Sequence, residues 1–420
     1  MSPLRLTLSQ RLLRSLAFLT FIPQFALGFD IQGTNNVVLY WGQNSAQISP
    51  QPPLKSFCAR PDVDILILSF IAILYSNEKI PILNQATAQC TRAPGSAGGQ
   101  VVCPDLALEI EYCREQGKKV LVSLGGATTG YEVQSPAEAE AAAKQIWDTY
   151  LGGGKDGMVV RPFGEVEVDG VDLDLESPVG QEGTHWPVFI DTIRSLYQNK
   201  VGRNGKKDYL ITASPQCVFP DVILSPAMRD KRSWFDMLFI QFYNNFCAPT
   251  NPSSFNFNEW AEWARSSSQN PSVKLFLGVP ASPSAAPAGG FAPLETLLEV
   301  SSDSMEDCEN ARIFWNSDTS AAAKNSSSPY NPFGGIAYWD ASWTSPEFTA
   351  ATKLGLTSGW EKAKSRSQFF KREEPSIDGE AESAADRKGK GRRSTLPSSR
   401  GRNRTPRRRH AIRRLRRHRR

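Results

Sequence analysis

Three acidic residues alternate with apolar residues just before position 177. They are Asp172, Asp174 and Glu176, and a leucine separates each from the next. Because neighbouring side chains of a β-strand point to opposite faces, a strand here would turn all three carboxyl groups the same way. A carboxyl group beside other carboxylates resists ionisation. We therefore expect Glu176, the outermost of the three, to keep a proton near neutral pH and to act as a general acid.

A calcium site is the alternative interpretation of these acids, since hard cations prefer carboxylate oxygens. Calcium loops wrap their ligands around the ion with turns that contain glycine, whereas this segment alternates as a strand does. The catalytic interpretation is preferred. No metal ion and no cofactor are expected.

The elements that must position the acids are eight short apolar runs, each about as long as a buried strand. Segments with helical spacing separate most of them, clearest at 135–151, 184–197 and 256–266. The first of these begins with Ser135-Pro136 and has Glu138 three residues after Ser135, a capping-box pattern. The eight runs are 37–43, 64–71, 119–126, 170–176, 209–216, 237–244, 275–281 and 334–340.

Strands that alternate with helices predict parallel pairing through crossover connections, and eight such units close a barrel. The fold class is therefore α/β, a single (β/α)8 TIM barrel. An open doubly wound sheet would usually show a glycine-rich phosphate turn after an early strand, and none follows the run 37–43. Glu176 would lie at the carboxyl end of the fourth strand, where barrel enzymes place their active sites.

The two ends of the chain differ from its centre. Residues 1–28 contain Arg5, Arg11 and Arg14 before an apolar stretch and a small-residue ending, which predicts a signal peptide cleaved before Phe29. The expected domains are thus a signal peptide (1–28), a catalytic barrel (29–356) and a disordered, arginine-rich tail (357–420). We expect a secreted, extracellular monomer with no membrane span after signal cleavage.

Charge is divided unevenly along the chain. Residues 1–360 carry 26 basic and 36 acidic side chains, a net charge of −10, and residues 361–420 carry 22 and 7, a net charge of +15. No nucleic-acid ligand is therefore expected for the folded domain. For the tail three readings stay open: removal near Lys371-Arg372, electrostatic contact with anionic wall polymers, or an absence of function that includes an error in gene prediction.

Export makes the seven cysteines candidates for disulfides, and an odd number leaves at least one unpaired. Closeness in sequence suggests Cys90 with Cys103.

The segment from Asp169 to Glu176 resembles the Asp-x-x-Asp-x-Asp-x-Glu signature of family 18 glycoside hydrolases, and further segments are similar to class III chitinases of plants and fungi. These segments occur in the family's order and cover roughly residues 33 to 355. They are Tyr40-Trp41-Gly42-Gln43-Asn44, Ser123-Leu124-Gly125-Gly126, Ala213-Ser214-Pro215-Gln216-Cys217, Gln241-Phe242-Tyr243-Asn244-Asn245, Leu277-Gly278-Val279-Pro280-Ala281 and Gly335-Ile336-Ala337-Tyr338-Trp339.

The resemblance implies an endochitinase that cleaves β-1,4 bonds of chitin and chito-oligosaccharides by a retaining, substrate-assisted mechanism. Glu176 would be the acid and then the base. Asp174 would hold the acetamide N–H of the sugar, Asp172 would share a proton with Asp174, and Tyr243 would aim the acetamide oxygen. The substrate-binding residues would be Tyr40, Gln241, Asn244, Gly125 and Gly126, with Trp339 as an apolar floor.

The resemblance also implies the disulfides Cys58–Cys113, Cys90–Cys103 and Cys217–Cys247, with Cys308 left over. Two other functions stay open. A carbohydrate-binding lectin on the same barrel would typically lack the terminal acid or the residues that aim the acetamide. An endo-β-N-acetylglucosaminidase acting on N-glycans would share the acid signature but is disfavoured by the class III-like strand segments.

Overall fold

The structure is a computed structural model that describes residues 28–74, 82–83, 89–94, 100–127, 131–154, 159–176, 183–199, 208–317 and 330–373. The predicted signal peptide, apart from Gly28, and the chain after residue 373 lie outside the described residues. The predictions made for them stay predictions.

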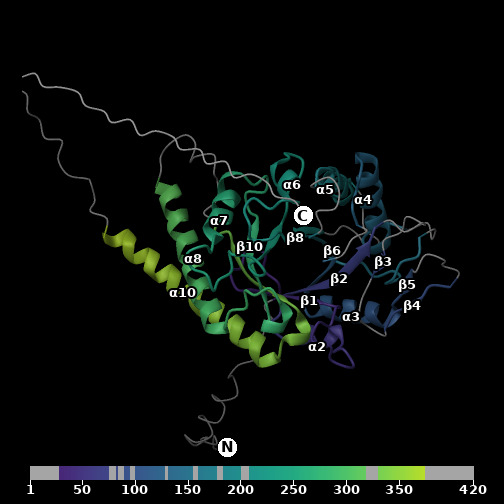
Figure 1. The fold of residues 1–420 in the computed structure, drawn as a ribbon, viewed down its shortest axis with the longest axis horizontal. Helices are drawn as coiled ribbons and strands as arrows, with labels where there is room; N and C mark the ends of the chain where they lie inside the picture. The colour runs from purple at the N-terminus through teal and green to yellow at the C-terminus, as the bar shows by residue number, and fades with distance from the viewer. Residues whose placement is uncertain are drawn as a thin grey trace, which may run out of the picture. The chain divides into compact units, whose positions relative to one another are not determined.

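Eight parallel strands close into a barrel, as the alternating pattern predicts (Figure 1). β1 pairs with both β2 and β11, which joins the two ends of the sheet. Most strand residues are buried, which is why most strands read as apolar runs, whereas β7 alternates acids with apolar residues. The strands are β1 (Asn36–Trp41), β2 (Ile65–Ile73), β6 (Lys119–Gly126), β7 (Gly170–Leu175), β8 (Leu210–Ala213), β9 (Met237–Gln241), β10 (Lys274–Pro280) and β11 (Phe333–Trp339).

Helices surround the barrel (Figure 1). They are α2 (Leu54–Cys58), α3 (Pro104–Glu115), α4 (Pro136–Tyr150), α5 (Trp186–Asn199), α6 (Ser225–Arg229), α7 (Phe257–Ser266), α8 (Leu294–Ser317) and α10 (Pro346–Glu373). Short additions are β3 (Ile82–Leu83), the β4–β5 pair (Thr91–Arg92 and Val101–Val102) and the turns η1 (Pro283–Ala285) and η2 (Ala341–Trp343). Within the described ranges, no helix has the length and apolar character needed to cross a bilayer.

The three predicted helices are present, and α4 starts as its sequence predicts. The Ser135 side chain accepts a hydrogen bond from the N–H of Glu138 at 3.2 Å, and Pro136 is the first helical residue. The Glu138 carboxylate reaches back to the N–H of Gln134 at 2.8 Å. The first contact satisfies an amide group that the first helical turn leaves without a partner, and the second holds the residue before the N-cap.

The folded region extends beyond the expected boundary at residue 356. Helix α10 continues to Glu373 and packs along α8. Leu356 and Ala363 are fully buried, and Trp360 packs against the core between them. Their spacing of four and three residues forms one apolar helix face, although the charged residues that surround it resemble a tail in composition.

Two groups of side chains fill the interior. One lies between the strands and the helices. The other consists almost entirely of strand residues and fills the inside of the barrel, with Phe239 and Phe276 among its larger members. Apolar side chains thus fill much of the inside of the barrel, and an active site is expected at the carboxyl ends of the strands.

Three aspartates fasten neighbouring strands at their amino ends. Each immediately precedes a strand, and its Oδ2 accepts the N–H of a residue in the strand before it. The pairs are Asp64 with Val37 (2.7 Å), Asp169 with Val120 (2.8 Å) and Asp236 with Ile211 (2.7 Å).

The three disulfides implied by the family resemblance are confirmed, with Cα–Cα distances of 5.0 Å for Cys58–Cys113, 4.2 Å for Cys90–Cys103 and 6.0 Å for Cys217–Cys247. Cys308 is a buried free thiol. All three bridges involve helices or connections and leave the strands unlinked.

Candidate active site

Strand β7 directs its acids into the barrel as the alternation predicts. Val171, Leu173 and Leu175 belong to the core between strands and helices. Asp172 is completely buried and Asp174 is 4% exposed, both on the opposite face of the strand. Glu176 follows the last residue of β7 and is partly exposed. The acid signature therefore leads from the barrel interior to its carboxyl-end face.

Asp172 is surrounded by hydroxyl groups. Its Oδ2 accepts hydrogen bonds from Ser123 Oγ (2.7 Å), Tyr40 Oη (3.1 Å) and Ser214 Oγ (3.1 Å), and its Oδ1 accepts one from Thr212 Oγ1 (2.6 Å). Burial raises the pKa of Asp172, and these hydrogen bonds oppose that rise because they favour the charged form. Both oxygens of Asp172 are thus held by donors from β1, β6 and β8 or from the residue that follows β8.

Asp174 and Glu176 form a pair of carboxyl groups that share one amide donor, Gln241. Burial raises the pKa of both groups, and the charges of Glu176 and Asp172 raise the pKa of Asp174 further. Gln241 Nε2 donates to Asp174 Oδ1 (2.8 Å) and to Glu176 Oε1 (3.0 Å). The family resemblance implied that Asp174 shares a proton with Asp172. That sharing stays a prediction, and the contacts of Asp172 described above are with hydroxyl groups.

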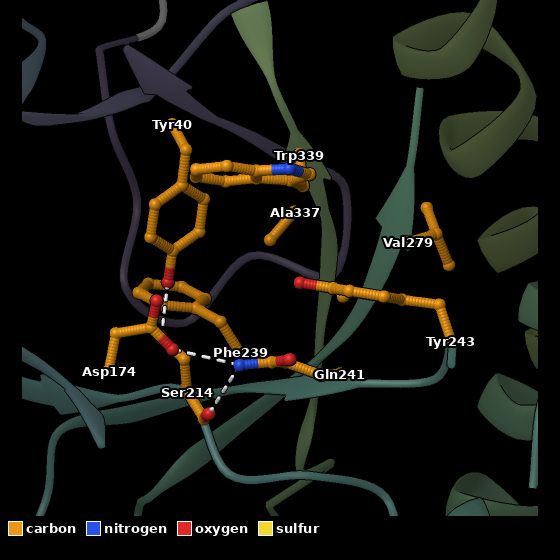
Figure 2. Close-up of a pocket in the computed structure, with 10 residues that line it drawn as sticks. Tyr40, Asp174, Ser214, Phe239, Gln241, Tyr243, Val279, Ala337 and Trp339 are labelled. Atoms are coloured by element: carbon orange, nitrogen blue, oxygen red, sulfur yellow. Dashed lines mark hydrogen bonds between the residues drawn. The ribbon is translucent and has the colours of Figure 1, made fainter. Parts of the chain in front are cut away.

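Figure 2 shows Gln241 bonded to Asp174 and to the main chain of Ser214, with the Tyr243 ring entering from the opposite side and its hydroxyl directed inward. Burial, followed by the charges of Asp174 and Glu176, raises the pKa of Tyr243 well above its ordinary value. Tyr243 is therefore protonated throughout the neutral range and can donate a hydrogen bond.

Above these groups lies a pocket of about 350 Å³. Its apolar side is Trp339, which stacks on Phe70 with ring centroids 5.6 Å apart and meets the edge of Tyr40 at 5.9 Å. An aromatic surface opposite carboxyl groups suits a sugar ring, which has an apolar face of C–H groups and polar hydroxyl edges. The lining residues are Gln43, Phe70, Ala72, Gly125, Ala127, Asp174, Glu176, Gln241, Tyr243, Asn244, Ala285 and Trp339.

Most of the predicted site residues meet at this pocket, but three take supporting places. Tyr40 is 6% exposed and contacts Asp172 beneath the pocket, where it lines a smaller space (Figure 2). Asp172 lies deeper still. Gly126 lies against Phe70, whose ring would be 2.8 Å from an added Cβ.

Gly125 lines the pocket, but its main requirement is conformational. It has a φ of +108°, and a Cβ there would be 2.2 Å from the carbonyl oxygen of Asp174. Gly290 makes a comparable close approach on the other side of the site, where a Cβ would be 2.6 Å from Tyr243 Cα. Glycine thus permits the close backbone packing on which both walls depend.

Phe70, Gln43 and Tyr131 were not predicted. Phe70 lies within the predicted second strand, near the end that faces the site, so its position offered a signal. Gln43 belongs to the first of the segments on which the family resemblance rests. Its Nε2 donates a hydrogen bond to the carbonyl oxygen of Ser69 at 2.8 Å. Tyr131 lies in the connection after β6, and its residue type and spacing gave no signal.

The site lies at the strand ends of a closed (β/α)8 barrel and combines a pair of carboxyl groups with an aromatic wall. This combination is typical of the glycoside hydrolase class. The chain belongs to Glycosyl hydrolases family 18, whose profile matches residues 36–365. This confirms the resemblance deduced from the strand segments.

Several proteins similar to this chain are chitinases. Chitinase 2 of Rhizopus oligosporus is 35% identical over 77% of this chain and 53% of its own length, and a class III chitinase of Arthroderma benhamiae is 32% identical over 81% and 93%. The chain spans about half the length of several fungal relatives that it matches. A solved chitinase from Ipomoea carnea is 28% identical, with a TM-score of 0.56, over 76% of this chain and 99% of that one.

A solved xylanase and α-amylase inhibitor protein, in complex with trehalose, has a TM-score of 0.54 and 25% identity over 78% of this chain and all of that one. The same barrel thus occurs in a protein described as an inhibitor. Function must therefore be argued from the site itself.

Proposed function

We propose that this protein is a secreted endochitinase that hydrolyses β-1,4 bonds between N-acetylglucosamine units with retention of configuration. The observation that carries the proposal is the pair of carboxyl groups of Asp174 and Glu176. Gln241 donates hydrogen bonds to both, and they line a pocket whose apolar side is Trp339. One carboxyl group of the pair can hold a proton at neutral pH, which a general acid requires.

In the first step, the substrate's own acetamide carbonyl oxygen attacks the anomeric carbon while Glu176 protonates the departing glycosidic oxygen. The C1–O bond breaks, the leaving sugar gains a hydroxyl, and a cyclic oxazolinium ion forms. Tyr243 would donate to the attacking oxygen. Asp174 would accept a hydrogen bond from the acetamide N–H. As it does so, the carboxyl proton of Asp174 would pass to Glu176, which then acts as the general acid.

In the second step, the Glu176 carboxylate takes a proton from water as the water oxygen attacks C1. The ring opens, the acetamide is restored, and the product has the β configuration of the substrate. Asp172, held by four hydroxyl donors, would remain negative and stabilise the positive charge of the intermediate.

The proposal is tested with the wild-type chain and a Glu176→Gln variant on N-acetylglucosamine hexamers, followed by product and anomer analysis. We expect shorter oligomers released as β anomers, and a rate for the variant that is lower by about 1000-fold. Glu140→Gln, at an exposed position on α4, is the matched control and should retain the wild-type rate. Equal turnover by Glu176→Gln would refute the acid assignment, and initial release of α anomers would refute retention.

The alternative function is that of a carbohydrate-binding lectin without catalytic activity. It is considered because the same barrel occurs in a protein described as an inhibitor. Presence of Asp172, Asp174, Glu176 and Tyr243 together favours the enzyme. Chitosan without acetyl groups should be a poor substrate because the attacking oxygen is missing. Hydrolysis of N-glycans in preference to chitin oligomers would instead favour the endo-β-N-acetylglucosaminidase function.

A further inference from the structure

Tyr131 contacts the proposed acid from outside the pocket. Its side chain is 1% exposed, and its Oη accepts a hydrogen bond from the main-chain N–H of Glu176 at 3.0 Å. Tyr131 belongs to the connection between β6 and α4 and is not one of the residues that line the pocket. Its contact with the acid is thus through the backbone and not through the carboxyl group.

The strand pairing explains why this N–H needs an acceptor from a loop. β6 pairs with β7 as far as Gly126, opposite Leu175, and ends there. On the other side, the pairing of β8 with β7 ends at Ala213, opposite Leu173. Glu176 is therefore the first residue of the chain beyond the strand pairing on both sides of β7. An amide that is withdrawn from water at such a point is costly without a hydrogen-bond acceptor.

The Tyr131 ring lies in ordinary contact range of Gly125. A Cβ at position 125 would be 3.4 Å from Tyr131 Cε1 as well as 2.2 Å from the carbonyl oxygen of Asp174. The ring thus packs closely beside the β6–β7 junction, and the buried side chain belongs to the main core. Its hydroxyl is held in place from two sides, by the core and by the end of β7.

We propose that Tyr131 is a positioning residue for Glu176, whose hydroxyl fixes the main chain at the end of β7 and so keeps the carboxyl group aimed at the glycosidic oxygen. The inference rests on the proposed function. Proton transfer depends steeply on geometry, and a misplacement on the order of 1 Å can lower a rate by about 100-fold. Substrates differ in their need for that proton. A sugar leaving group requires it, whereas a nitrophenolate can depart with little assistance.

The test is Tyr131→Phe, measured on chitin oligomers and on a 4-nitrophenyl chito-oligosaccharide. We expect kcat/KM on the oligomer to fall by about 10-fold or more with KM within about 2-fold of wild type, and kcat/KM for nitrophenol release to fall by less than about 3-fold. Tyr338→Phe is the matched control. Tyr338 is fully buried and its Oη bonds to Thr352 Oγ1 (3.0 Å) on α10, so both rates should stay unchanged.

Equal losses on the two substrates, or no loss on either, would overturn the role of Tyr131. Amide hydrogen exchange of Glu176 in the wild-type protein gives a second test that needs no variant. Slow exchange supports the hydrogen bond, and exchange as fast as that of a solvent-exposed amide contradicts it. A wild-type chain that cleaves neither substrate would refute the proposed function itself, which is distinguishable from a failure of the variant alone.

Discussion

Gln241 is the residue that holds the two carboxyl groups of the site together. Its Nε2 lies 2.8 Å from Asp174 Oδ1, 3.0 Å from Glu176 Oε1 and 3.1 Å from the carbonyl oxygen of Ser214. The first two bonds favour the charged carboxylates and lower the pKa of each, against the larger rise caused by burial. Gln241 therefore influences the pH range in which one carboxyl group of the pair is protonated. This effect is additional to the sugar contact that the family resemblance implied.

Replacing the amide with a thioether of similar size removes these donors, so Gln241→Met should raise the pKa of the pair. A general acid works while it is protonated, and activity is lost as the pH rises through its pKa. The alkaline limb of the profile of kcat/KM against pH should therefore move to higher pH in Gln241→Met. Gln43→Met, in the same pocket but bonded to Ser69, should leave that limb in place. A limb that moves to lower pH in Gln241→Met would contradict this account.

Residue types and spacing sufficed to predict the acids, because strand alternation alone turns Asp172, Asp174 and Glu176 to one side. The joint contact of Gln241 with Asp174 and Glu176 could not be predicted that way. The same holds for the hydroxyl groups that enclose Asp172, which come from three other strands and from Ser214. Tyr131 was unpredictable for a similar reason, since its partner is a backbone amide far away in sequence.

At the scale of elements, the first acid of the signature has a different role from the other three. Asp169 lies at the amino end of β7, is 3% exposed, and accepts the N–H of Val120 at 2.8 Å. Asp64 and Asp236 do the same before β2 and β9. Asp169 thus ties β7 to β6 at the end of the barrel remote from the pocket, and the signature combines a structural acid with a group of site acids.

Asp169→Ala should lower the free energy of unfolding by about 2 kcal/mol, because it leaves the buried N–H of Val120 without its acceptor. Urea unfolding of the oxidised protein measures this change. Since the pocket lies at the other end of β7, kcat on chitin oligomers should stay within about 2-fold of wild type at a temperature where both proteins are folded. Asp105→Ala, at an exposed position in the first turn of α3, should cost less than about 1 kcal/mol. A large loss of kcat in the folded Asp169→Ala variant would assign this residue to the site instead.

Seven barrel strands were predictable because a strand covered on both faces is apolar along most of its length, and β7 because its acids alternate with core residues. The helix α4 was predictable from its cap, which is a local signal. The end of α10 was not, since Trp360 and Ala363 are single apolar residues in a polar and charged stretch that follows Leu356. Their role depends on the presence of α8 alongside, where an added Cβ on Gly355 would lie 2.3 Å from Leu298.

At the scale of the whole molecule, charge is divided between an acidic part and a basic end of the chain. Residues 1–360 carry a net charge of −10 and residues 361–420 one of +15, and all of the described pocket lies in the acidic part. We propose that the basic segment attracts anionic wall polymers, an attraction that salt would screen. None of the described residues that line the pocket belongs to that segment.

A chain that ends at residue 373 should hydrolyse soluble chitin oligomers within about 2-fold of the full chain, since the last described buried residue is Ala363. On carboxymethyl-cellulose beads, used as an anionic polysaccharide, the full chain should be retained at low salt and released at about 1 M salt, where the screening length is roughly 3 Å. The shortened chain should not be retained. Equal retention of both chains would assign the attraction to the barrel.

The Cys217–Cys247 disulfide closes a ring of main chain that contains all of β9, and with it Gln241 and Tyr243. Glu176 lies outside that ring. Failure to form this bridge would loosen the strand from which Gln241 contacts Asp174 and Glu176 and after which Tyr243 enters the pocket. Oxidation of one cysteine pair outside the pocket would thus bear on the acid and on the orientation of the sugar together.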